Sequence, residues 1–141
     1  MPIKSNGFTL MEMMVVLVVM GVVAGLAMPQ YARSVERSYR KDAENQLMLI
    51  HSAQEMYASR NNNAFWGPAV GATPALKLAN INQNLALNTL ANGMNYDCTG
   101  AGAAYSCTAA RNGGAAFTIT ITQAVVNPGV NPSCAPVAEC P

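Results

Sequence analysis

The chain has 141 residues, which suits one domain of ordinary size. Just over half of the residues are apolar and only 11% are charged, a low charge density for a small soluble protein. Seven acidic residues oppose eight basic ones, so no global field attracts the chain to nucleic acid or to an acidic partner.

One long apolar segment lies near the N-terminus. From Met13 to Met28 no side chain is polar, and the largely apolar stretch counted from Phe8 is 21 residues long. As a helix it spans about 32 Å, roughly the hydrocarbon core of a bilayer. The chain has too little other apolar material to bury such a helix in a soluble core, and the run exceeds the about 7–15 residues of a secretory signal. We therefore expect a membrane-spanning helix over residues 8–28.

Two features of this segment are unusual for a plain anchor. Glu12 places a carboxylate near the start of the span, where a charge is costly and is by default a functional candidate. Gly7 directly precedes the bulky Phe8, with polar residues upstream and apolar residues downstream.

The run Gly7–Glu12 reads Gly-Phe-Thr-Leu-Met-Glu and resembles the type IV prepilin signature. Pro29 at the end of the apolar stretch, followed by Tyr31, extends the resemblance. The similarity covers about the first 35 residues strongly and the C-terminal region hardly at all.

This resemblance implies a route of maturation. Residues 1–7 would be a leader that a prepilin peptidase removes between Gly7 and Phe8 on the cytoplasmic face, and the new amine of Phe8 would be methylated. Lys4 agrees with this orientation, since cytoplasmic flanks are enriched in Lys and Arg. The mature chain would cross the inner membrane once, with its head in the periplasm, and later join an extracellular pilus.

Glu12 has a physical role that does not depend on the family. The α-amine of Phe8 would titrate near about 7.7–8 and be mostly cationic at neutral pH. In an apolar filament core, an unpaired carboxylate or ammonium is costly. A subunit that places its Phe8 amine beside Glu12 of a neighbour satisfies both charges and fixes the register of assembly. An interfacial glutamate that reaches the lipid headgroups is the alternative.

Gly21 and Gly25 lie on one helix face as a pair of small residues, a pattern that lets helices approach closely. With Pro29 they also weaken the helix, because proline removes a backbone hydrogen bond and glycine costs up to about 1 kcal/mol relative to alanine. The family resemblance implies that the stretch from Gly21 to Pro29 loses helix on assembly.

An amphipathic helical pattern continues through residues 29–60. Its apolar and aromatic side chains recur at three- and four-residue steps apart from one wider gap, and they are Tyr31, Val35, Tyr39, Ala43, Leu47, Ile50 and Tyr57. Charges lie between them, with Glu36 and Arg40 at a favourable spacing. These charged side chains either face solvent or pair with opposite charges on neighbouring subunits of a filament. The helix is expected to end near Arg60, where Asn61–Asn63 offers a left-handed cap.

The head, residues 61–141, is rich in Ala, Asn, Gly, Thr and Pro. Residues 117–122 alternate between apolar and hydroxyl side chains, which predicts a half-buried strand. Residues 96–98 and 105–108 predict shorter strands around a Gly-rich turn at 100–102. Residues 76–90 fit a short helix or an irregular loop. The tail, with Pro128, Pro132 and Pro136, is expected to be a stapled surface loop.

All four cysteines lie in the last third of the chain, at Cys98, Cys107, Cys134 and Cys140. An even set in an exported region indicates two disulfides. A zinc site is disfavoured because no histidine accompanies them and neither pair has the usual two-residue gap. Four cysteines allow three pairings. The sequential pairing is favoured because each bond closes a short local loop.

The expected fold class is α+β, with a long N-terminal helix and a small antiparallel sheet stapled by disulfides, as the pilin resemblance also implies. No enzyme, cofactor or metal site is expected. The single histidine, His51, has only Glu55 as a nearby carboxylate, and the sequence has no phosphate loop. In the head, Asp97 and Glu139 are too few carboxylates to predict calcium.

The sequence therefore predicts a structural subunit of a type IV pilus, serving adhesion, motility or DNA uptake. Its expected partners are identical or related pilin subunits, the inner membrane, the prepilin peptidase and the pilus assembly machinery. A pseudopilin of a type II secretion system is the close alternative. A minor pilin with a binding head and a plain membrane-anchored periplasmic protein are further alternatives. The nearly neutral head gives no support to electrostatic capture of DNA.

Overall fold

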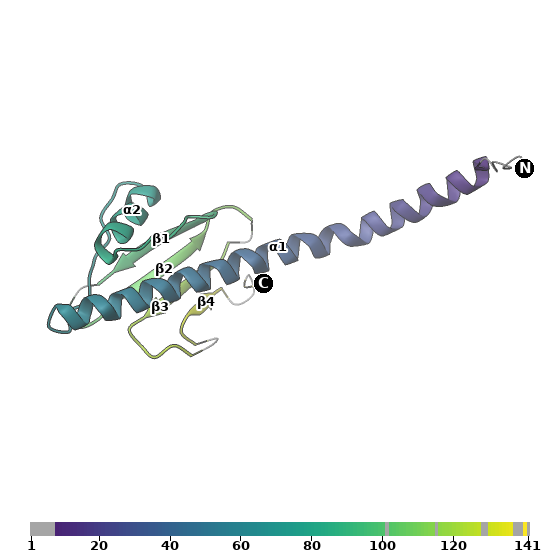
Figure 1. Cartoon of the computed structure of the whole chain (residues 1–141). Coiled ribbons are helices and arrows are strands. Elements are labelled where there is room, and N and C mark those ends of the chain that lie inside the picture. Colours follow the sequence, from purple (N-terminus) through teal and green to yellow (C-terminus); the bar gives the residue numbers. More distant parts are fainter. Residues whose placement is uncertain (1–7, 101, 115, 128–129, 137–139, 141) are drawn as a thin grey trace, which may run out of the picture. The chain divides into compact units, whose positions relative to one another are not determined.

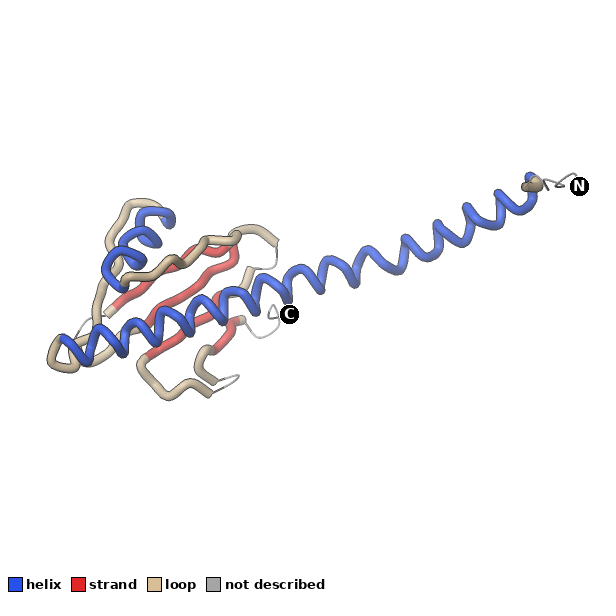
Figure 2. The backbone as a smooth tube through the Cα atoms, viewed as in Figure 1, coloured by secondary structure: helices blue, strands red, loops and turns tan. Residues whose placement is uncertain are grey.

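The computed structural model describes residues 8–100, 102–114, 116–127, 130–136 and 140. The expected leader with Gly7, and also Pro128 and Glu139, lie outside the described residues. Two compact units are present, Met1–Val35 and Glu36–Pro141. In chain order, the helices and strands are α1 (Leu10–Arg60), α2 (Pro74–Leu85), β1 (Met94–Thr99), β2 (Ser106–Arg111), β3 (Thr118–Thr122) and β4 (Ser133–Ala135) (Figures 1 and 2).

In the second unit, α1 packs on one face of a four-stranded sheet (Figure 2). Ala43, Leu47 and Ile50 of α1 are fully buried there, which places the predicted helical stripe in the core. Leu78 and Ile81 of α2 join the same core. Tyr31, which belongs to the predicted stripe but lies in the first unit, is 73% exposed.

The sheet is antiparallel throughout, with strand order β1-β2-β3-β4. Its register aligns Tyr96 with Ala109, Ala109 with Ile119, and Ile119 with Cys134 across all four strands. The first three are buried and face the helix, whereas the alternate residues of each strand are half-buried or exposed. The predicted α+β fold is therefore confirmed.

The structure decides the segment that the sequence left open. Residues 74–85 form α2 because Thr73 caps the helix, accepting a hydrogen bond from the Leu76 amide at 3.3 Å, and Pro74 occupies the first turn. The tail differs from the expected loop, since Ser133–Ala135 pairs with β3 as a fourth strand. Its length of three residues fits an edge strand that starts after Pro132 and ends before Pro136.

Amide side chains tie two of the long loops to the helices. Gln54, fully buried on α1, bonds both the amide and the carbonyl of Trp66 at 2.9 Å. Asn82 on α2 does the same for Thr89, at 3.0 and 2.9 Å. Each side-chain amide donates a hydrogen bond to the backbone carbonyl of its partner and accepts one from the backbone N–H. These backbone groups are therefore satisfied although they do not pair with a neighbouring strand.

Candidate functional site

The first unit contains the N-terminal part of α1, and Glu12 lies in its first turn. Thr9 precedes the helix, and its hydroxyl accepts a hydrogen bond from the Glu12 amide at 3.2 Å. This is the geometry of a helix cap, which fixes where α1 begins. A carboxylate in the first turn is also favoured by the helix dipole. No ion pair or hydrogen bond reaches the Glu12 carboxylate from any residue that the structure describes.

The segment that follows is apolar and open on all sides. Every side chain described between Phe8 and Met28 is exposed, Leu17 at 70% and Leu26 at 70% among them. In the part of the chain that is described, α1 is the one helix long and apolar enough to cross a membrane, with a mean hydropathy of 2.4 in its most apolar window. Exposed apolar surface of this extent indicates a membrane or a protein partner.

Both glycines of the predicted small-residue pair lie in this helix. A Cβ added at Gly21 or Gly25 would meet no atom within 4 Å, so neither glycine is required by packing inside the subunit. The backbone of α1 stays helical through Pro29. Any need for Gly21 and Gly25 must therefore come from contacts outside the subunit or from a change in the helix.

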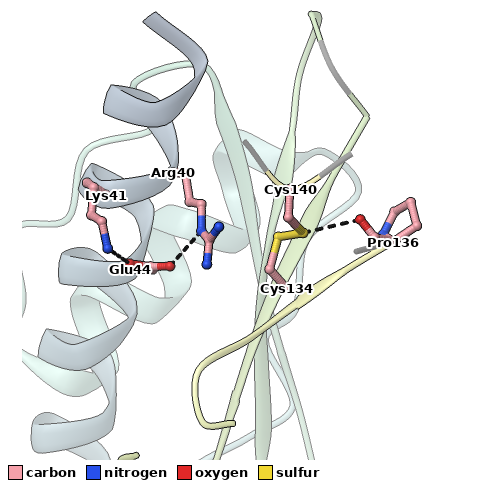
Figure 3. Close-up of polar contacts among 6 residues, drawn as sticks. All are labelled: Arg40, Lys41, Glu44, Cys134, Pro136 and Cys140. Carbon is pink, nitrogen blue, oxygen red and sulfur yellow. Dashed lines mark hydrogen bonds and ion pairs between the residues drawn. A yellow bond between two sulfur atoms is a disulfide. The ribbon is translucent and has the colours of Figure 1, made fainter. Parts of the chain in front are cut away.

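The cysteines form two disulfides in sequential pairs. Cys98 and Cys107 face each other across β1 and β2, and both are fully buried. Cys134 on β4 joins Cys140, whose Sγ lies 3.2 Å from the carbonyl oxygen of Pro136 (Figure 3). The first bond staples the hairpin inside the core, and the second holds the C-terminal segment against β4.

Most basic side chains of the second unit are engaged by carboxylates. On α1, Arg40 and Lys41 bond Glu44 at 2.8 and 2.9 Å (Figure 3). Burial acts to raise the pKa of Glu44, but the hydrogen bonds and charges of Lys41 and Arg40 outweigh it and hold that pKa below its usual range. Lys77 pairs in the same way with Asp97.

Arg111 makes the most extensive of these contacts. Its guanidinium bonds Glu36 at 3.0 and 3.3 Å, donates to the Gly93 carbonyl at 2.9 Å, and lies 3.8 Å from the centre of the Tyr39 ring. Gly114 packs tightly beside this cluster, since a Cβ there would lie 2.2 Å from Glu36 Oε1. We call Arg111, Glu36 and Tyr39 the arginine clamp. It joins the end of β2 to α1.

His51 takes part in packing and hydrogen bonding. Its Nδ1 bonds the hydroxyl of Tyr105, whose ring also packs against Phe65. Burial, with a smaller effect of the Glu55 charge, raises the pKa of Tyr105, which keeps the phenol protonated and able to donate. The described residues include no cluster of three or more potential metal ligands.

The sequence reasoning missed the arginine clamp and the amide ties. Glu36 and Arg111 lie 75 positions apart, so helical spacing could not reveal their contact. Gln54 lies in the wider gap of the apolar stripe and faces the core. Because a buried side-chain amide needs hydrogen-bond partners, a glutamine at this position could have indicated a hydrogen bond to a loop.

Two family models match the chain. The prokaryotic N-terminal methylation motif matches residues 3–28, and the model described as type IV minor pilin ComP, DNA uptake sequence receptor, matches residues 29–137. Together the two matches run through the apolar helix and the head.

Curated relatives match over a shorter length. Type II secretion system core protein G of Pectobacterium carotovorum subsp. carotovorum is 39% identical over 59 residues, which are 42% of this chain and 38% of that protein. The same-named protein of Aeromonas hydrophila is 34% identical over 42% of this chain and 41% of its own length. Type IV major pilin protein PilA of Myxococcus xanthus is 30% identical over 42% of this chain and 27% of its own length. The chain thus spans at most about two fifths of these relatives.

No solved structure matches the chain. The minor pilin model covers the amphipathic part of α1 and most of the head, which is more than half of the chain. Because this model matches residues 29–137, the chain belongs to the family of the type IV minor pilin ComP, DNA uptake sequence receptor.

Proposed function

We propose that this type IV pilin is cut between Gly7 and Phe8, methylated at Phe8, and assembled into a filament through the apolar part of α1. The observation that carries the proposal is the exposed apolar segment of α1 with the carboxylate of Glu12 in its first turn. In a filament, the apolar side chains pack against neighbouring helices, and Glu12 meets the new amine of an adjacent subunit. In this proposal residues 1–7 are the leader, 8–60 the assembly helix and 61–141 the head.

Intact-mass analysis of sheared filaments and washed membranes tests this proposal. We expect a chain that starts at methylated Phe8 and is lighter by four hydrogens for two disulfides. The same processed chain confined to membranes would favour a pseudopilin or a low-copy minor pilin. Substituting Gly7 with a bulky residue is expected to leave the full-length mass in the membrane, because the peptidase site is lost. A normal mature mass in that variant would contradict the cleavage site.

A second proposed function is DNA binding by the head, and the match to a DNA uptake sequence receptor model favours it. Phosphate contacts would contribute little, because Arg40, Lys41, Lys77 and Arg111 are already engaged by carboxylates. Recognition of the bases would then carry most of the affinity.

We therefore expect DNA binding with a weak dependence on salt. Of the basic residues in the second unit, Arg37 and Arg60 have no ion pair among the described residues. About two phosphate contacts correspond to a slope of about −2 in log K against log salt. Fluorescence anisotropy of the full chain in detergent, with a labelled specific duplex and a scrambled one, measures this slope. A much steeper slope, or equal affinity for both duplexes, would contradict base recognition.

A further inference from the structure

The head contains two Asn-Gly pairs, Asn92–Gly93 and Asn112–Gly113. An asparagine that precedes glycine is open to deamidation, because glycine has no Cβ to hinder attack by its backbone nitrogen on the asparagine side chain. Both asparagines are exposed to water. Any difference in their reactivity therefore comes mainly from the structure around each pair.

Hydrogen bonds hold the pair Asn92–Gly93 in one conformation. Both residues have positive φ angles, 41° and 72°, and the Met94 amide donates to the Ala91 carbonyl at 2.7 Å, as in a type I′ turn. The side-chain amide of Asn92 donates to the carboxylate of Asp42 at 2.9 Å. To react, Asn92 must rotate its side chain and its backbone until its Cγ meets the Gly93 nitrogen. The turn and the bond to Asp42 both resist that rotation.

The pair Asn112–Gly113, in the loop that follows β2, is held less tightly. The Asn112 amide donates to the Gly93 carbonyl at 2.9 Å, and the Asn112 carbonyl accepts a longer bond from the Arg111 side chain at 3.2 Å. Among the residues that the structure describes, none bonds the Asn112 side chain or the Gly113 backbone. A Cβ added at Gly113 would meet no atom within 4 Å, so the space around this pair is open.

We propose that Asn112 is a site of spontaneous deamidation and that the fold protects Asn92 from the same reaction. The Gly113 nitrogen bonds to Cγ of Asn112 and gives up its proton, and the side-chain nitrogen leaves as ammonia. The five-membered succinimide that forms then takes up water. It opens at one carbonyl to aspartate and at the other to isoaspartate. The net reaction consumes water, releases ammonia and adds a negative charge to the chain at neutral pH.

The new carboxylate lies next in sequence to the arginine clamp. Arg111 already faces Glu36, and a second carboxylate on the neighbouring residue repels Glu36. Isoaspartate also lengthens the backbone by a carbon just before Gly114. A Cβ at Gly114 would lie 2.2 Å from Glu36 Oε1, so the loop has little room to shift there. Isoaspartate at position 112 is therefore expected to loosen the contact between the end of β2 and α1.

Trypsin separates the two pairs for measurement. It cleaves after Arg111, so peptide 78–111 carries Asn92 and peptide 112–141 carries Asn112. Each disulfide lies within one of these peptides. The mass of each peptide therefore follows one Asn-Gly pair, because deamidation makes it heavier by the difference between water and ammonia.

Peptide 112–141 reports Asn112 without interference. Its other asparagines, Asn127 and Asn131, both precede prolines. Proline has no backbone N–H, so these two asparagines cannot form a succinimide by this route. Asn112→Ser removes the reacting amide and is the matched control, expected to keep the mass of this peptide constant.

Incubation of the full chain in detergent, at neutral and at mildly alkaline pH, tests the proposal. Asn112 is expected to deamidate at least about tenfold faster than Asn92, a difference of about 1.4 kcal/mol in barrier height. The rate should rise with pH, because the attacking nitrogen must lose its proton. Asp42→Ala frees the Asn92 amide and should speed the reaction there without changing the rate at Asn112. Equal rates at the two sites, or no gain in mass of peptide 112–141, overturns the proposal.

The melting temperature of the deamidated chain tests the effect on the arginine clamp. After separation by ion exchange, the isoaspartate form is expected to melt at least about 4 °C below the unchanged chain. Asn112→Asp carries the added charge without the longer backbone, and it should melt between the two. An unchanged melting temperature for the isoaspartate form contradicts the effect on the clamp.

Discussion

Glu12→Ala is expected to leave the chain processed and membrane-bound but to reduce its entry into filaments at least a hundredfold. The Glu12 carboxylate has no partner among the described residues of its own subunit, so it is free to meet the amine of a neighbour. Removing one member of a buried ion pair leaves an uncompensated charge, at a cost of about 3–5 kcal/mol. A factor of ten in an equilibrium constant corresponds to about 1.4 kcal/mol, which gives the expected loss.

Immunoblots of sheared filaments and of membranes, with intact mass to confirm processing, measure this effect. Glu55→Ala removes an exposed carboxylate from the second unit and is the matched control, expected to assemble normally. Glu12→Gln tests whether shape alone suffices, and it should assemble nearly as poorly as Glu12→Ala because it cannot neutralise an ammonium. A normal filament yield from Glu12→Ala would contradict the charge-pairing role.

Local sequence patterns predicted the helices and strands in which the order of apolar and polar side chains matches their burial. The strict alternation at residues 117–122 gave β3, since a strand with one wet face must alternate. The apolar stripe at Ala43, Leu47 and Ile50 gave the face of α1 that packs on the sheet. Arg60 ends α1 before Asn62 and Asn63, which adopt the left-handed conformation.

Structural features that depend on contacts between residues far apart in the chain were not predicted from the sequence. β4 is three residues long and lies between prolines, so its pairing with β3 is decided by the sheet and not by its own composition. The hydrogen bonds of the buried Asn131 side chain with Thr122 and Ala124 likewise join residues seven and nine positions apart, which no local pattern predicts. The expected pairing of Glu12 needs a second subunit, and one chain cannot display it.

Arg111→Ala is expected to destabilise the head by about 3–5 kcal/mol, because it leaves the Glu36 carboxylate without its partner in a largely buried position. The side chains of Arg111 and Glu36 are only 9% and 19% exposed. The substitution also removes the hydrogen bond to Gly93 and the cation contact with Tyr39. For a domain of about 100 residues, such a loss lowers the melting temperature by at least about 12 °C.

Thermal unfolding of the full chain in detergent, followed by near-UV circular dichroism, measures this loss. Lys41→Ala is the matched control, since the Lys41 side chain is 74% exposed and its pair with Glu44 is expected to contribute under about 1 kcal/mol. Adding Glu36→Gln to Arg111→Ala should recover part of the stability, because no uncompensated charge then remains. Equal melting temperatures for Arg111→Ala and Lys41→Ala would show that the arginine clamp does not hold the sheet on α1, and the docking of the head would then rest on its apolar core alone.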